Sequence, residues 1–156
     1  MHTIMIHMQQ QVNIKFVKTH KDARLPKFNI EDPLIGDIGA DVYSTGYVTV
    51  PAHGSIICPV GLTVGYITPG YYFIIAPRSG LGFKHGIMPH AGRIDNQYRG
   101  DIGIKLFNLS DEDYVVNIGD RIAQLEFHKL IQPEFSFTDE VTDSARGEKG
   151  FGSSGN

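Results

Sequence analysis

The chain has 156 residues, 41% of them hydrophobic and 20% charged, which suits one soluble domain with a substantial core and is too short for two. Its formal net charge is -3 and it has no basic block, so neither a nucleic-acid polymer nor an anionic membrane surface is the expected partner. The 18 glycines and 8 prolines follow no period and predict many turns, as in an all-β protein.

The single cysteine, Cys58, lies in the apolar run IICPV, where we expect a buried and unreactive thiol. A lone cysteine excludes an internal disulfide and indicates a reducing compartment. The first residues lack the charged and apolar regions of a secretory signal, and no stretch is long enough to span a membrane. We therefore expect a cytoplasmic protein, or a nuclear one if its source is eukaryotic or viral. Met5 and Met8 leave the native start open.

Alternation of apolar and polar residues predicts a strand within 11–18, followed by a long, turn-rich surface connection over 19–39. Shorter apolar runs follow, and Gly, Pro and Asn separate them at the spacing expected of a β-sandwich or barrel. The predicted strands cover 48–50, 55–60, 62–67, 71–76, 101–109, 114–118 and 121–131.

Two segments bear on helix content. The composition of 121–131 also allows a helix, but its alternating pattern favours a strand. The one helix we expect is short, with Ser79 as its N-cap and its end near Gly86.

The pattern decays after Pro133, so we predict a β-barrel domain over 1–140 and a flexible C-terminal arm over 141–156. The arm contains Arg146 and Phe151 among glycines and serines. By itself such a segment is usually a disordered end. The alternative is a lid that becomes ordered over a ligand, with the glycines allowing close backbone approach.

The segment Gly92–Asp101, GRIDNQYRGD, predicts a tight hairpin that carries a carboxylate, a phenol and a cation. Held on a stiff support, Asp95 has the chemistry of a general base. Taken alone, however, Asp95 is more often an Asx-turn residue and Tyr98 is more often a packing residue.

Two further segments suggest a phosphate site. APRSGLG places Arg78, Ser79 and backbone N–H groups at a helix start, a combination that binds phosphate, although an ordinary capped turn fits equally well. In GDRIAQL, Gln124 is expected on the polar strand face as a donor to an anion. Asp120 and Arg121 are expected to cap a turn and pair with each other.

A third segment, GADVYS, contains Asp41, which is either a turn acceptor or a carboxylate that holds metal-bound water. Walker-type and common zinc signatures are absent from the sequence. The seven histidines are scattered, and the pair His85 and His90 is more often fortuitous than metal-binding.

In this order, five segments resemble the motifs of the homotrimeric dUTPase family: GADVYS, APRSGLG, GRIDNQYRGD, GDRIAQL and RGEKGFGSSG. The likeness runs from about Asp37 to the C-terminus. It implies a distorted jelly-roll-like β-barrel, a homotrimer with shared active sites, and magnesium-assisted hydrolysis of dUTP to dUMP and pyrophosphate. Such an enzyme limits uracil incorporation into DNA and supplies dUMP for dTMP synthesis.

By position, Asp95 matches the family's general base and Tyr98 the residue beneath the deoxyribose. Asp41 matches the carboxylate that contacts the Mg²⁺ ion through water. The remaining matches are substrate-binding groups: backbone around Gly92 and Ile94 for uracil; Arg78, Ser79, Gly80 and Gln124 for phosphate; Arg146 for the γ-phosphate; Phe151 for stacking on uracil; and Gly152, Ser153 and Ser154 for phosphate contacts.

Arg93 departs from the family pattern, which usually has a small apolar residue there. Two other functions stay open at this point. One is dCTP deamination, by the related branch that shares the fold, although the Ser79–Gly80 pair and Phe151 favour the dUTPase side. The other is a regulatory binding protein whose nucleotide-ordered arm recruits a protein partner, which nothing in the sequence requires.

Overall fold

The computed structural model describes residues 11–149, which form strands and one short helix. In chain order the elements are β1 (Ile14–Lys18), β2 (Gly39–Tyr43), β3 (Val48–Val50), β4 (Ser55–Ile67), β5 (Tyr71–Ala76), α1 (Ser79–His85), β6 (Ile87–Pro89), β7 (Arg93–Ile94), β8 (Asp101–Asn108), β9 (Tyr114–Val116) and β10 (Arg121–Lys129).

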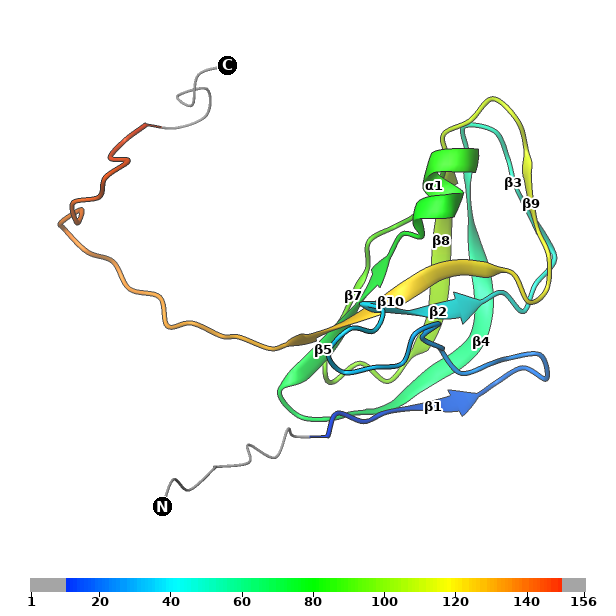
Figure 1. Cartoon of the computed structure of the whole chain (residues 1–156), viewed down its shortest axis with the longest axis horizontal. Helices are drawn as coiled ribbons and strands as arrows, with labels where there is room; N and C mark the ends of the chain where they lie inside the picture. Colours follow the sequence, from blue (N-terminus) through cyan, green and yellow to red (C-terminus); the bar gives the residue numbers. More distant parts are fainter. Residues whose placement is uncertain (1–10, 150–156) are drawn as a thin grey trace.

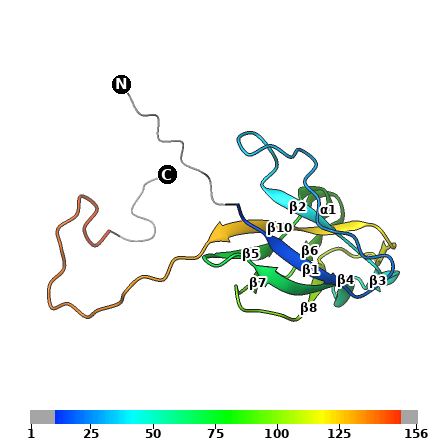
Figure 2. The same cartoon turned by 90° about the horizontal axis from the view of Figure 1, so that it is seen from below.

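The strands form two four-stranded antiparallel sheets, ordered β1-β4-β8-β6 and β2-β10-β5-β7, and a two-stranded ribbon of β3 and β9. No two neighbouring strands of a sheet are consecutive in the sequence (Figure 1), which is typical of a jelly-roll-like barrel. Figure 2 shows from below that the strands of the two sheets form one body. The predicted all-β class with one short helix is confirmed.

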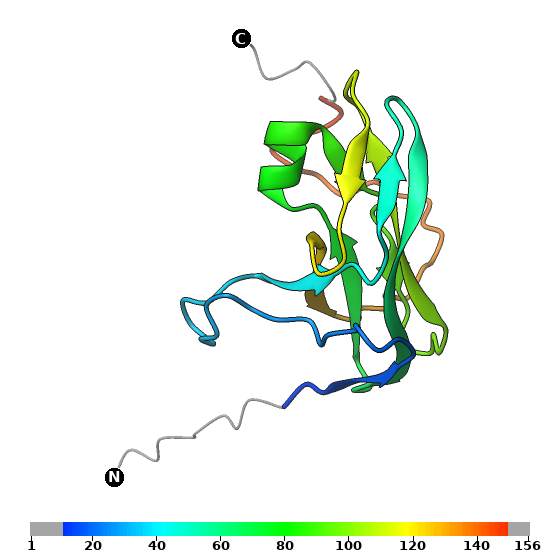
Figure 3. The same ribbon diagram turned by 90° about the vertical axis from the view of Figure 1, so that its right-hand side faces the viewer.

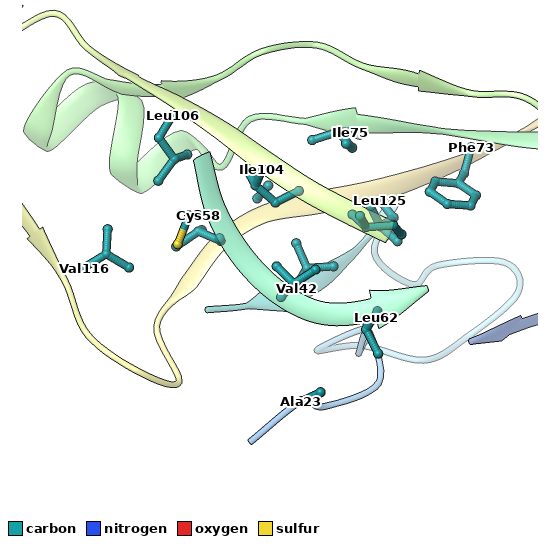
Figure 4. Close-up of a cluster of buried hydrophobic side chains, with 14 of the residues drawn as sticks. Ala23, Val42, Cys58, Leu62, Phe73, Ile75, Ile104, Leu106, Val116 and Leu125 are labelled. Carbon is teal, nitrogen blue, oxygen red and sulfur yellow. The ribbon is translucent and has the colours of Figure 1, made fainter. Parts of the chain in front are cut away.

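The core lies between the two sheets because each contributes one apolar face. In β8, Ile102, Ile104 and Leu106 are buried while the residues between them are exposed. These residues belong to one buried cluster with Phe73 and Leu125 of the other sheet and with Cys58, and Figure 4 shows part of this cluster. Cys58 is fully buried, so the expectation of a buried thiol is confirmed.

Strand β4 is longer than the sequence predicts, because it joins the two runs 55–60 and 62–67. Its pairing with β8 shifts register between Pro59 and Thr63. Gly61 lies at this irregularity with a φ of 66°, a conformation that glycine adopts without strain. The glycine that looked like a break between strands is a β-bulge within one strand.

Helix α1 covers the predicted segment, but Ser79 is its first residue and Arg78 is the N-cap. The prediction of Ser79 as the N-cap was therefore wrong by one position. The backbone of Arg78 is extended, with φ -95° and ψ 128°, as an N-cap requires. Gly86 ends the helix with a φ of 65°.

The predicted hairpin over Gly92–Asp101 is wrong in its pairing. Strand β7 pairs with β5, whereas β8 pairs with β4 and β6, so the two strands on either side of the turn belong to different sheets. The turn at 95–98 is tight, since the N–H of Tyr98 donates to the carbonyl of Asp95 at 3.0 Å. It leads the chain from one sheet to the other.

Residues 130–149 contain no helix or strand and leave the barrel as an extended segment (Figure 1). The connection between β1 and β2 also projects from the barrel (Figure 3). Within residues 11–149, no helix has the length and apolar character needed to cross a bilayer. The boundary between a domain and an arm at residue 140 stays a prediction.

Candidate functional site

A row of three residues across β2, β10 and β5 forms the centre of the predicted phosphate site. Gln124 of β10 lies opposite Asp41 of β2 and opposite Ala76 of β5. Directly opposed residues of antiparallel strands have their side chains on the same face. The chain then turns after Ala76 through Pro77 to Arg78, which brings motifs from three distant parts of the sequence together.

The carboxylate of Asp41 is almost fully buried and lies between two guanidinium groups. Arg78 donates through Nε to Oδ1 at 2.8 Å, and Arg121 Nη1 lies 3.5 Å from Oδ2. Asn29 also donates to Oδ2, at 3.3 Å. The negative charge of the buried Asp41 carboxylate is therefore balanced by two positive guanidinium groups. The cluster of one carboxylate and two arginines has a net charge of about +1.

The expected pairing of Asp120 with Arg121 is wrong. Asp120 accepts a hydrogen bond from the N–H of Asn117 at 2.9 Å, within the turn before β10, while Arg121 reaches Asp41. The two side chains diverge because the next residues form a strand, where neighbours point to opposite sides.

Gln124 lies over the start of β2 and donates through Nε2 to the carbonyl of Pro77 at 2.8 Å. A Cβ atom at Gly39 would overlap the Gln124 side chain. Glycine at position 39 is therefore what allows the amide to lie beside Asp41 and the turn to α1.

Ser79 and Gly80 begin α1, next to the Arg78 side chain. A Cβ atom added to Gly80 would meet no atom within 4 Å, so the space in front of this backbone is open. Hydrogen bonds thus bring Arg78, Ser79, Gly80, Gln124 and Asp41 close together, and their role in binding phosphate stays a prediction.

The turn after β7 holds Asp95 and Tyr98 on a rigid support. Asn96 fixes the turn to the β4–β5 connection, because its Nδ2 donates to the carbonyls of Thr68 and Tyr71, each at 2.9 Å. Arg99 Nη1 donates to the carbonyls of Asn96 and Tyr98 at 2.7 and 2.8 Å. Sequence reasoning missed both of these supporting residues; the signal available was an Asn inside a turn.

Tyr98 folds back over Gly100, where a Cβ atom would overlap the phenol ring, and its hydroxyl donates to the carbonyl of Asp101 at 2.7 Å. Tyr98 is 41% exposed, so part of the residue remains accessible. Asp95 is exposed, and the half-buried Ile94 pairs with Phe73. The carbonyl of Gly92 accepts the N–H of Ile75 at 2.7 Å.

Within one chain, Asp95 and its turn lie apart from the predicted phosphate-binding residues that follow β5. Ile94 pairs with Phe73, three residues before the end of β5, and Asp95 lies one position further from that end. At about 3.3 Å per residue, some 13 Å of strand separates Asp95 from Ala76, with the Pro77–Arg78 turn beyond it. The predicted base and the predicted phosphate ligands are not brought together by this fold alone.

The residues around Asp41 suit a magnesium ion that contacts the protein through water, and not one that the protein binds directly. Both oxygens of Asp41 already face cations or an amide, and within residues 11–149 no three His, Cys, Asp or Glu side chains form a metal-binding group. Magnesium commonly keeps several waters and is held by substrate phosphates with few carboxylates. The donor set fits an ion that arrives with a phosphate ligand and contacts the protein through water.

Of the predicted site residues in the arm, only Arg146 lies within the part of the chain that the structure describes. Arg146 is exposed, and its Nε donates to the carbonyl of Lys149 at 2.6 Å. Phe151, Gly152, Ser153 and Ser154 lie outside the described residues. Their roles stay predictions.

A surface hollow of about 400 Å³ lies between the end of α1 and the loop before β9. Its lining includes His85 and Tyr114, whose rings are 5.0 Å apart, and burial raises the pKa of the Tyr114 hydroxyl. The predicted site residues do not line this hollow.

Comparisons of the sequence and of the structure with known proteins find similarity to the same family. The dUTPase family model matches residues 30–155. The chain is 36% identical to the deoxyuridine 5'-triphosphate nucleotidohydrolase of Helicobacter pylori over 146 residues, covering 92% of this chain and 97% of that protein. It is 46% identical to the mitochondrial enzyme of that name from Dictyostelium discoideum over 120 residues, covering 77% and 66%.

Among solved structures, the fold is similar to that of the dUTPase of Staphylococcus bacteriophage 80alpha bound to dUpNHpp. The TM-score is 0.75 and the sequence identity 27%, with 95% of this chain and all of the other chain covered.

Proposed function

The chain belongs to the dUTPase family, and from this we propose that it hydrolyses dUTP to dUMP and pyrophosphate at sites shared between copies of the chain. The observation that supports a shared site is the separation of Asp95 from Arg78 along β5. Each group is incomplete without the other, so a neighbouring copy has to supply the missing half. The homotrimer expected from the family resemblance meets this requirement.

Asp95 acts as the general base in this mechanism. Its exposed carboxylate accepts a proton from a water molecule, and the resulting hydroxide attacks the α-phosphorus. Hydrogen bonds from Asn96 and Arg99 hold the turn, which limits the motion of the base relative to the water. The bond from the α-phosphorus to the bridging oxygen breaks, and pyrophosphate leaves.

Selection for deoxyuridine rests on the same turn. The ring of Tyr98 packs beneath the deoxyribose, where a ribose 2′-hydroxyl would clash. Backbone groups near Gly92 and Ile94 read uracil, and rejection of cytosine follows from leaving a buried donor or acceptor unpaired. The backbone at Gly92 is held to β5 by the hydrogen bond to Ile75, so the slot is rigid.

Arg78, Gln124 and the first backbone N–H groups of α1 bind the phosphates. A magnesium ion would neutralise charge on the triphosphate, and Asp41 would be the residue that holds it, through water. Arg146, Phe151, Gly152 and Ser153 of the arm close over the nucleotide and exclude bulk water. We place this reaction in the cytoplasm.

A substrate panel tests the activity directly. The full-length protein is incubated with dUTP, dCTP, dTTP or UTP and magnesium, and pyrophosphate and ammonia are measured. We expect pyrophosphate from dUTP in strong preference to the other nucleotides. Ammonia release from dCTP would assign the chain to the deaminase branch instead.

Mixing two inactive variants tests the shared site. Asp95→Asn removes the base and Arg78→Ala removes a phosphate ligand, so each homogeneous assembly is expected to be inactive. Mixed assemblies contain some sites with both residues intact, and activity should return after the two proteins are unfolded and refolded together. Light scattering should report a trimer. Absence of restored activity in verified mixed trimers would place both residues of each site in one chain.

A further inference from the structure

The register of β10 against β2 gives Arg121 an unexpected position. Arg121 lies opposite Tyr43, and Gln124 lies opposite Asp41, with a register shift between Arg121 and Ala123. Asp41 and Tyr43 are two positions apart and therefore share a face. Arg121 and Gln124 are three positions apart, so in a regular strand they would face opposite sides.

The β-bulge resolves this difference. An extra residue in one strand rotates the side chains that precede it, and the consecutive residues Ile122 and Ala123 are both buried at this place. The bulge thus turns Arg121 onto the face that carries Gln124 and Asp41. Bulges commonly re-aim a side chain in this way beside active sites.

The two arginines are held by Asp41 to different degrees. Arg78 contacts Oδ1 at 2.8 Å and its side chain is 24% exposed, whereas Arg121 is 3.5 Å from Oδ2 and 47% exposed. Arg78 Nη1 also donates to the backbone carbonyl of Arg121 at 3.4 Å. Arg78 is therefore fixed in place. Arg121 makes a looser contact, so it can leave Asp41 for another anion at a small cost in free energy.

We propose that Arg121 is a second polyphosphate-binding arginine, which moves from Asp41 to the pyrophosphate part of the substrate. This inference rests on the proposed function for the identity of the substrate. In the unliganded chain Asp41 supplies a negative charge that holds both guanidinium groups together. When a phosphate chain arrives, Arg121 forms charge-assisted hydrogen bonds to it, and Arg78 keeps its tight contact with the carboxylate.

Calorimetry with two probes tests the assignment, using the full-length chain. Inorganic pyrophosphate contains the group that Arg121 binds, and dUMP lacks it. Arg121→Gln should weaken pyrophosphate binding about tenfold or more, the range expected for a lost hydrogen bond to a charged group, and leave dUMP binding within about twofold. Arg121→Lys should give an intermediate loss, because lysine keeps the charge without the planar fork.

Lys105→Gln is the matched control for loss of one positive charge, since Lys105 lies on β8 in the other sheet, over the ring of Phe107. It should bind both probes as the unmodified chain does. Thermal unfolding checks that each variant is folded; if Arg121→Gln is not, Arg121→Lys decides the matter. Unchanged pyrophosphate binding, or an equal loss for pyrophosphate and dUMP, would overturn the proposal.

The outcome is separable from that of the proposed function. If the unmodified protein does not hydrolyse dUTP, the reaction assignment fails whatever Arg121 does. If the protein hydrolyses dUTP and Arg121→Gln binds pyrophosphate normally, only the role of Arg121 fails.

Discussion

Asn96 holds the turn of the proposed base by donating through Nδ2 to the backbone carbonyl of Tyr71 at 2.9 Å. The same nitrogen lies 2.9 Å from the carbonyl of Thr68. Asn96→Ala removes both of these hydrogen bonds, although the Thr68 carbonyl still accepts the N–H of Tyr71, so we expect the free energy of unfolding to fall by about 1–3 kcal/mol. Urea unfolding measures this change.

The same variant should lower kcat for dUTP because the turn holds Asp95 less firmly. Gln97→Ala is the control: Gln97 Nε2 donates only within the turn, to Asn96 Oδ1 at 2.9 Å. Its stability should change by less than about 0.5 kcal/mol. Equal effects of the two substitutions would show that Asn96 does not support the turn.

Replacement of the proposed base has a distinct kinetic signature. Asp95→Asn removes the proton acceptor and keeps the size of the side chain, so kcat should fall about 10³-fold while affinity for a non-hydrolysable dUTP analogue is retained. Asp111→Asn, which alters an exposed carboxylate near His53, should keep normal turnover. An active Asp95→Asn enzyme would refute the assignment.

Gly39 and Gln124 provide a coupled test of the phosphate surface. Gly39→Ala places a methyl group where the Gln124 side chain lies, so we expect a loss of stability of about 1–3 kcal/mol from overpacking. In a Gln124→Ala background this loss should largely disappear, because the obstructing side chain is gone. A double-mutant cycle of unfolding free energies measures the coupling, and additive effects would contradict it.

Cys58 should make stability depend on alkaline pH. Burial raises the pKa of the Cys58 thiol above its ordinary value. The unfolded thiol then ionises at lower pH than the folded one, so the folded state binds more protons and stability falls as pH rises above about 8.5. Relative to Cys58→Ala, the unmodified chain should lose stability across this range in urea unfolding. Parallel pH profiles would contradict the prediction.

Truncation of the arm separates its role from that of the barrel. Residues 130–149 contain no helix or strand and are exposed throughout. A chain that ends at Ala145 should therefore unfold at nearly the same temperature and keep its oligomeric state. Its kcat/KM for dUTP should fall about 10²-fold through the loss of Arg146 and the residues after it. Full activity would return the arm to the role of a disordered end.

Local patterns predicted most strands because their alternation reflects a single buried face. The bounds of β3 and β5 match the predicted runs, and the uncertain segment 121–131 is the strand β10. Strand β6 was missed because its three residues are too few to show a period. Strand β7 was assigned to a hairpin because turn residues indicate where a chain reverses and not which strand it then pairs with.

The site shows the same limit. The segment containing Arg78, Ser79 and Gly80 and the position of Gln124 followed from local chemistry and strand period. The pairing of Arg121 with Asp41 did not, because it depends on a bulge and on contacts between β2 and β10, 80 positions apart in the sequence. Asn96 was missed for a similar reason, since its acceptors lie in another connection.

The placement of Asp95 and Arg78 toward opposite ends of β5 has a consequence for the cell. On the proposed shared site, a newly synthesised chain has no activity until it meets other copies. At low expression, activity should rise more steeply than the amount of protein. A mutant chain that lacks one half of the site would disable one site of any assembly that it joins, so activity should fall in proportion to the mutant chains present while the remaining sites keep working.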